Sequence, residues 1–154
     1  MKIIIEVPGI NDHKRVNELA KQVQELHVEW NPDIYVSVDE VIQSDYYESL
    51  IRNNEIITAK IENEIVGYLV FTIKEVSVPI LRRKKVMAID SICVDEKFRG
   101  LGIGTRMLEY VKDLAGKSGC TDLSLSVYHS NTNAVKMYES FGFKKKNISY
   151  TMKI

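Results

Sequence analysis

Hydrophobic residues near the amino terminus follow first the spacing of a strand and then that of a helix. The short apolar run Lys2–Val7 predicts a β-strand, because it is closed by a Pro-Gly pair that favours a turn. Further along, apolar residues recur three and four positions apart. This spacing predicts a helix that begins at Asn11 or Asp12 and ends near Trp30.

The middle of the chain predicts a second helix followed by three strands. Ser37 with Glu40 three positions later is a capping-box pattern, and it indicates the start of the second helix. Strands are expected at Glu55–Ile61 and Ile65–Val76, joined by a short turn as a β-hairpin. A basic loop then leads to a strand at Val86–Val94.

In the second half of the chain, helices and strands alternate. The Gly-rich turn Arg99–Gly104 precedes a helix whose apolar residues share one face. Apolar and polar residues alternate along Asp122–Tyr128, which predicts a strand. The last helix is expected to begin near Ser130 or Asn131 and to end at Gly142, because glycine readily adopts the left-handed backbone that ends many helices.

The tail Phe143–Ile154 is expected to form one or two final strands. Hairpins thus come first along the chain, and crossover helices follow. This order predicts an α/β fold with a mixed, mostly antiparallel sheet and helices on both faces. No repeat or linker divides the chain, so residues 1–154 are expected to form a single domain.

Composition narrows the functional classes. Lys and Arg together number 21, as do Asp and Glu, and this balance excludes an overall basic surface for nucleic acid. No stretch reaches the roughly 18 apolar residues of a membrane span, so no membrane partner is expected. The cysteines and histidines show no metal-ligand spacing, and no metal site is expected. The first apolar run is too short for a signal peptide, which predicts a cytoplasmic protein.

The Gly-rich turn is the strongest candidate for ligand binding. A helix amino terminus offers unpaired N–H groups and the positive end of a dipole, and glycines let an anion approach the backbone. A phosphate or pyrophosphate is therefore the expected ligand, although the glycines could serve the turn geometry alone. The dinucleotide fingerprint fails because Met107 stands where it requires glycine, and the Walker A pattern fails in the same way at Val111.

Two blocks of sequence resemble a known family. The pattern Arg-x-x-Gly-x-Gly at Arg99–Gly104, which follows the strand Ala-Ile-Asp-Ser-Ile-Cys-Val, resembles the acetyl-CoA-binding signature of the GCN5-related N-acetyltransferases (GNAT family). The segment Asn131–Phe143 looks like the family's second block, Asn-x-x-Ala…Tyr…Gly-Phe. One helix and one strand fit between the two blocks, as in the family.

The resemblance implies that acetyl-CoA is the cosubstrate. The CoA pyrophosphate would lie on the turn, and the pantetheine arm would pair with the strand near Ile92–Val94. That arm would occupy a cleft where two parallel strands, Asp90–Val94 and Leu123–Tyr128, splay apart. The residues assigned to the cosubstrate by the resemblance are Ile92, Cys93, Val94, Arg99, Gly100, Leu101, Gly102, Ile103, Gly104, Thr105 and Asn131.

The resemblance also implies direct attack of an amine on the thioester, without a covalent acyl-enzyme. Tyr138 would donate a proton to the CoA sulfur, unless it is only a core tyrosine. Asp90 would be the general base, acting through a water, unless it only pairs with a neighbouring cation. A backbone N–H near Ile92 or Cys93 would stabilise the oxyanion. Asn131 could bind the pantetheine or cap its helix.

The acceptor is expected to be a primary amine, on a small molecule or on a protein. The first two predicted helices contribute aromatic residues, among them Trp30, Tyr35, Tyr46 and Tyr47, which suit a cation but also suit packing. An alternative function is a non-catalytic acyl-CoA-binding regulatory module. The resemblance is also compatible with a homodimer.

Overall fold

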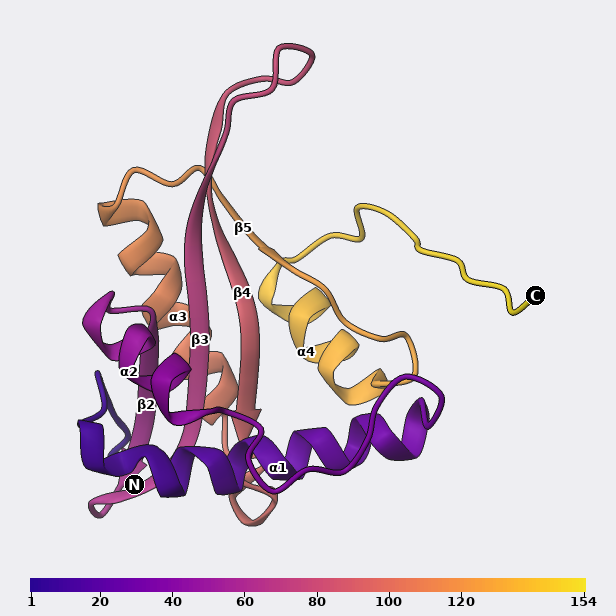
Figure 1. Cartoon of the computed structure of the whole chain (residues 1–154). Coiled ribbons are helices and arrows are strands. Elements are labelled where there is room, and N and C mark those ends of the chain that lie inside the picture. The colour runs from indigo at the N-terminus through magenta and orange to yellow at the C-terminus, as the bar shows by residue number, and fades with distance from the viewer.

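A five-stranded sheet in the order β1-β2-β3-β4-β5 forms the centre of the computed structural model, which describes residues 1–154 (Figure 1). Its strands are β1 (Ile4–Glu6), β2 (Ile56–Ile61), β3 (Glu64–Val76), β4 (Lys84–Val94) and β5 (Asp122–Leu125). Neighbours from β1 to β4 pair antiparallel, whereas β5 pairs parallel with β4. The predicted mixed, mostly antiparallel sheet is confirmed.

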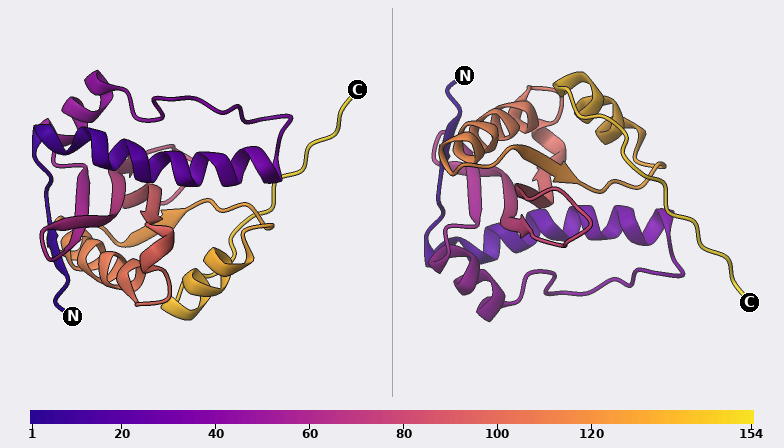
Figure 2. Two further views of the ribbon diagram at one scale, coloured as in Figure 1. Left: turned by 90° about the horizontal axis from the view of Figure 1, so that it is seen from below. Right: turned by 90° about the horizontal axis from the view of Figure 1, so that it is seen from above.

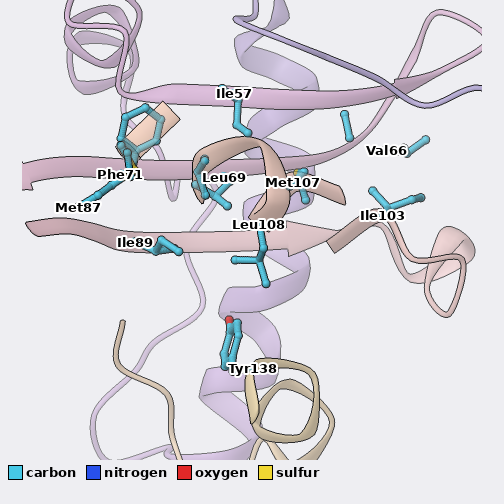
Figure 3. Close-up of a cluster of buried hydrophobic side chains, with 13 residues drawn as sticks. Ile57, Val66, Leu69, Phe71, Met87, Ile89, Ile103, Met107, Leu108 and Tyr138 are labelled. Atoms are coloured by element: carbon cyan, nitrogen blue, oxygen red, sulfur yellow. The ribbon is translucent and has the colours of Figure 1, made fainter. Parts of the chain in front are cut away.

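Helices cover both faces of this sheet, as predicted (Figure 2). The helices are α1 (His13–Trp30), α2 (Ser44–Arg52), α3 (Ile103–Lys117) and α4 (Thr132–Phe141). One hydrophobic cluster joins α1 and α2 to one face through residues such as Leu19, Leu50 and Val70. A second cluster joins α3 and α4 to the other face, and it includes Leu69, Met107 and Tyr138 (Figure 3). Neither α1–α4 nor any shorter helix is long and apolar enough to cross a membrane.

The second helix begins later than the sequence indicates. The prediction that Ser37 and Glu40 form a capping box at the start of this helix is wrong, because α2 begins at Ser44. The Ser37 hydroxyl instead donates to Glu25 Oε2 over 3.0 Å. Glu40 Oε1 does accept from the backbone N–H of Ser44, also over 3.0 Å, so this carboxylate stabilises a helix start four residues further on.

The carboxyl-terminal elements are shorter than expected. β5 ends at Leu125, three residues before the predicted end at Tyr128. The tail Phe143–Ile154 forms no strand and pairs with none, so the expected final strands are absent from this chain. Its apolar side chains, among them Ile148, Tyr150 and Met152, are exposed to solvent.

Candidate active site

Strands β4 and β5 separate partway along their length. Their parallel pairing runs from Val86 opposite Asp122 to Ile89 opposite Leu125, and stops there. β4 continues to Val94 and pairs only with β3 over this last stretch. One edge of β4 therefore carries backbone N–H and C=O groups with no strand partner, as a ligand with amide groups requires.

A β-bulge lies at the start of this free edge. Val70 on β3 pairs with Ser91 and Phe71 pairs with Ile89, which leaves Asp90 as the extra residue. The Ser91 hydroxyl lies 3.1 Å from the Tyr68 hydroxyl, on the sheet face that α1 and α2 cover. Bulges redirect side chains, and this one lies where the pairing of β4 with β5 ends.

Asp90 is exposed and belongs to a small polar group on the α2 side of the sheet. Thr72 Oγ1 donates to Asp90 Oδ2 over 3.1 Å. Burial and the nearby charges of Asp90 and Glu55 raise the pKa of Tyr46, which comes from α2. Acidic and aromatic groups therefore gather around this carboxylate.

The Gly-rich turn precedes α3 in the expected place. Gly100 and Gly102 have φ angles of +78° and +77°, a backbone conformation that favours glycine. Side chains added at these two positions would meet no protein atom within 4 Å, so the backbone here is open to a ligand. Arg99 Nε donates to the Val94 carbonyl over 3.1 Å, which ties the turn to the end of β4. The first N–H groups of α3 have no partner within the helix and are available to an anion.

A surface cavity of about 770 Å³ adjoins the turn. It is lined by Met1, Lys2, Ile3, Leu101, Gly102, Thr105 and Arg106. Two cationic side chains thus flank the helix amino terminus, as an anionic ligand requires. Lys2 was missed by the sequence reasoning, because no local pattern signals a contact between residues a hundred positions apart.

Gly104 does not face the ligand side of the turn. A Cβ at this position would lie 2.9 Å from Met137 Sδ, so Gly104 allows the close approach of α4 to α3. Ile103 is also buried and packs in the cluster of Figure 3. The side chain of Ile103 and the absence of a side chain at Gly104 both serve packing. Only the backbone N–H groups of these two residues are open to an anion.

Tyr138 combines packing with a free hydroxyl. The residue is 8% exposed, and its ring meets Phe143 edge-on with 5.8 Å between the ring centroids. The hydroxyl points toward β4 in Figure 3 and makes no hydrogen bond within the chain. Burial raises the pKa of this phenol to about 12, so it is protonated at neutral pH and can act as a hydrogen-bond donor.

Two further candidates have clear structural partners. Asn131 Oδ1 accepts from the backbone N–H of Ala134 over 3.3 Å, so Asn131 caps α4, and its amide nitrogen is left for another partner. Cys93 Sγ donates to the Leu19 carbonyl over 3.2 Å. Burial raises the pKa of the Cys93 thiol to about 12, which makes it a packing residue rather than a nucleophile. Its neighbours Ile92 and Val94 contact the opposite cluster, on the side of α3 and α4.

The aromatic residues expected around an acceptor divide into separate groups. Tyr47 is fully buried and its hydroxyl donates to the Gly9 carbonyl over 2.8 Å, so it is a core residue. The Tyr35 hydroxyl lies 2.8 Å from that of Tyr128, just after β5. The ring of His27 lies 4.7 Å from that of Tyr35. His27, Tyr35 and Tyr128 therefore connect the end of α1 to the segment after β5, where the chain diverges from β4.

An ion pair that the sequence did not signal supports the loop before the turn. Asp95 is 3% exposed, and it accepts from the backbone N–H of Lys97 over 3.1 Å and from Arg15 Nη2. Although burial opposes ionisation, the bonds from Lys97, Arg15 and Gln22 lower the pKa of Asp95. An aspartate before a short turn is a recognisable cap, but its partner Arg15 lies 80 positions away in the chain.

Together these elements offer an open strand edge, a turn with exposed backbone N–H groups and a largely buried tyrosine that could hold an extended, phosphate-bearing ligand. A family model described as the acetyltransferase (GNAT) family matches residues 20–143. Because the match spans most of the sequence, the chain belongs to the GNAT family of acetyltransferases. The family resemblance is confirmed, and so is the expected enzyme class of N-acetyltransferase.

Individual relatives agree with this assignment. The chain is 22% identical over 141 residues to the spermine/spermidine N(1)-acetyltransferase of Bacillus subtilis, a match that covers 91% of this chain and 88% of the relative. A mutant of the BH1408 protein of Bacillus halodurans has the same fold, with a TM-score of 0.94, 24% identity, and coverage of 98% and 99% of the two chains. The aminoglycoside N-acetyltransferase AAC(6')-Iy in complex with CoA superposes with a TM-score of 0.74 at 16% identity, and covers 99% and 95% of the two chains.

Proposed function

We propose that this protein transfers the acetyl group of acetyl-CoA to a primary amine by direct attack in a ternary complex. The observation that carries the proposal is the hydroxyl of Tyr138, which is protonated, makes no hydrogen bond within the chain and faces the strand β4 whose edge is free.

The turn and the free edge of β4 would hold the cosubstrate. Backbone N–H groups between Arg99 and Thr105 would bind the pyrophosphate, and the cations Lys2 and Arg106 would add charge-assisted contacts. The pantetheine amides would pair with Ile92–Val94 in place of the missing part of β5. The CoA in the structure of the aminoglycoside N-acetyltransferase supports this ligand class.

The chemistry would then be shared between the two faces of the sheet. Asp90, through a water, would take up a proton from the attacking amine as the new C–N bond forms. A backbone N–H near Ile92 or Cys93 would stabilise the oxyanion. When the C–S bond breaks, Tyr138 would give its proton to the departing thiolate, and the electron pair of that bond would remain on sulfur.

The acceptor we favour is a small cationic amine that enters from the α2 side. Asp90 and Glu55 carry negative charge near Tyr46 there, and an aromatic ring beside carboxylates attracts a cation. The name of the spermine/spermidine N(1)-acetyltransferase relative supports polyamines as the first amines to test.

Two measurements test the proposal together. Thermal or chemical unfolding with acetyl-CoA at one hundred times its dissociation constant should show stabilisation by about 2.7 kcal/mol. Release of free thiol should then be followed across polyamines, amino acids, antibiotic amines and peptides with free amino termini. Release with at least one amine is the expected result. Stabilisation without release by any amine would favour the non-catalytic acyl-CoA-binding module, and the absence of both would refute the proposal.

A further inference from the structure

Helix α1 holds the loop that precedes the Gly-rich turn through the side-chain amide of Gln22. The amide nitrogen Nε2 donates to Asp95 Oδ1 over 3.4 Å, and the oxygen Oε1 accepts from the backbone N–H of Glu96 over 3.0 Å. These two contacts join residues 73 and 74 positions apart in the chain. One side chain of α1 thus binds two consecutive residues of the loop.

Arg15 attaches the same loop to α1 at a second point. It lies two turns of helix before Gln22, so the two side chains leave α1 on one face. Arg15 Nη2 donates to Asp95 Oδ2, and Arg15 Nε donates to the Ile65 carbonyl over 3.0 Å. The Asp95 carboxylate also accepts from the backbone N–H of Lys97. A single buried carboxylate therefore joins α1, the start of β3 and the loop.

The loop determines where the Gly-rich turn lies. Asp95 directly follows β4, and its side chain caps the short 3₁₀-helix Glu96–Phe98, which leads into Arg99. Gly100 and Gly102 then adopt positive φ, and a glycine has no side chain that could hold such a backbone in place. The arrangement of the N–H groups in the turn therefore depends on how the loop before it is held. A displacement of about 1 Å is enough to impair a precisely positioned contact.

We propose that Gln22 and Arg15, acting through Asp95, are positioning residues for the cosubstrate. They hold the loop so that the N–H groups of the turn converge on the phosphates, although α1 packs on the sheet face opposite α3 (Figure 2). Their loss weakens acetyl-CoA binding and leaves the chemical step unchanged once the cosubstrate is bound. This inference rests on the proposed function, in which the turn binds acetyl-CoA.

Gln24 provides a matched control on the same helix. Its Nε2 donates to the Val36 carbonyl over 2.8 Å, in the loop between α1 and α2, and so holds a different segment. Methionine has nearly the length and helix propensity of glutamine but lacks the amide. In calorimetric titration, Gln22→Met should weaken acetyl-CoA binding roughly tenfold, whereas Gln24→Met should stay within about twofold of wild type. Wild-type affinity in Gln22→Met, or equal weakening in both variants, would overturn the inference.

Kinetics separate positioning from a loss of stability. Gln22→Met should raise KM for acetyl-CoA and leave kcat at saturating cosubstrate within about twofold of wild type. A variant that is merely less stable loses kcat with its folded fraction and keeps its KM, and that pattern would contradict the inference. Gln22→Ala repeats both measurements if Gln22→Met does not fold.

Hydrogen exchange followed by NMR tests the contact itself. The Glu96 N–H loses its acceptor in Gln22→Met and should exchange faster than in wild type, while Gln24→Met should leave it unchanged. Equal exchange in wild type and Gln22→Met would overturn the inference.

Failure of the proposed function gives a different result. A wild-type chain that binds no acetyl-CoA would refute the proposed function and this inference together. A wild-type chain that binds acetyl-CoA, with Gln22→Met of equal affinity, would refute this inference alone.

Discussion

Replacing Tyr138 by phenylalanine removes one oxygen atom and no hydrogen bond of the folded chain. The ring that packs among α3, α4 and Phe143 stays in place, and the hydroxyl that is lost has no partner to leave behind. The free energy of unfolding should therefore change by less than about 1 kcal/mol. Tyr138→Ala, which also removes the ring, should cost about 3–4 kcal/mol and serves as a packing control.

The effect on catalysis should be much larger than the effect on stability. General acid catalysis typically contributes 10²–10⁴-fold, and we expect Tyr138→Phe to lower kcat by roughly 10²-fold. That factor corresponds to about 2.7 kcal/mol in the activation barrier. Acetyl-CoA affinity should stay within about threefold of wild type, because the donor is needed mainly when the sulfur becomes negative. Since the pKa of the phenol is raised to about 12, the wild-type donor keeps its proton throughout the neutral range.

The assay is steady-state thiol release with the best acceptor, beside calorimetric titration of acetyl-CoA. A pre-steady-state burst measurement establishes whether chemistry limits the rate. If chemistry limits the rate and kcat of Tyr138→Phe stays within threefold of wild type, the tyrosine is a packing residue and the proton-donor role is wrong.

Three further substitutions probe other parts of the site. Asp90→Asn should reduce turnover most at low pH, and less as rising pH deprotonates the amine without help; an equal loss at every pH in a rate profile would contradict a general base. Gly104→Val should lower the free energy of unfolding in urea by about 1–3 kcal/mol because it overpacks against Met137, and unchanged stability would contradict that contact. Asp95→Asn should cost roughly 3 kcal/mol at neutral pH by breaking the pair with Arg15. Because the folded-state pKa of Asp95 is lowered, its contribution is complete above the ordinary carboxyl pKa of about 4 and is lost as pH falls; an equal cost at pH 2 would contradict this linkage.

Strong periodicity explains which elements could be predicted from sequence. The helix ending at Trp30 and the long strands β3 and β4 carry apolar residues at unambiguous spacing, and they were found nearly in full. The start of α2 was misplaced because Ser37 satisfies its hydroxyl on Glu25 of α1, a tertiary contact that no local pattern signals. The tail Phe143–Ile154 was expected to form final strands, but it pairs with no strand of its own chain.

Sequence alone could predict those parts of the site that are marked by a short local pattern. Glycines in the turn before α3 indicate an anion, and the two sequence blocks direct attention to Tyr138. The bulge at Asp90 depends on the register between β3 and β4, which apolar alternation does not determine. Lys2 and Arg15 reach the turn and its supporting loop from distant parts of the chain, so only the folded structure reveals them.

Calorimetric titration of acetyl-CoA against a matched pair of glycine variants tests the central claim, that the turn before α3 binds the cosubstrate. Gly102 and Gly119 have φ angles of +77° and +79°, and a side chain at either would meet no protein atom within 4 Å. Valine should therefore strain the backbone similarly at both positions. We expect one acetyl-CoA per chain for wild type and Gly119→Val, and affinity weakened at least tenfold for Gly102→Val, whose side chain blocks the approach of the pyrophosphate. Wild-type affinity in Gly102→Val, or equal weakening in both variants, would contradict the account.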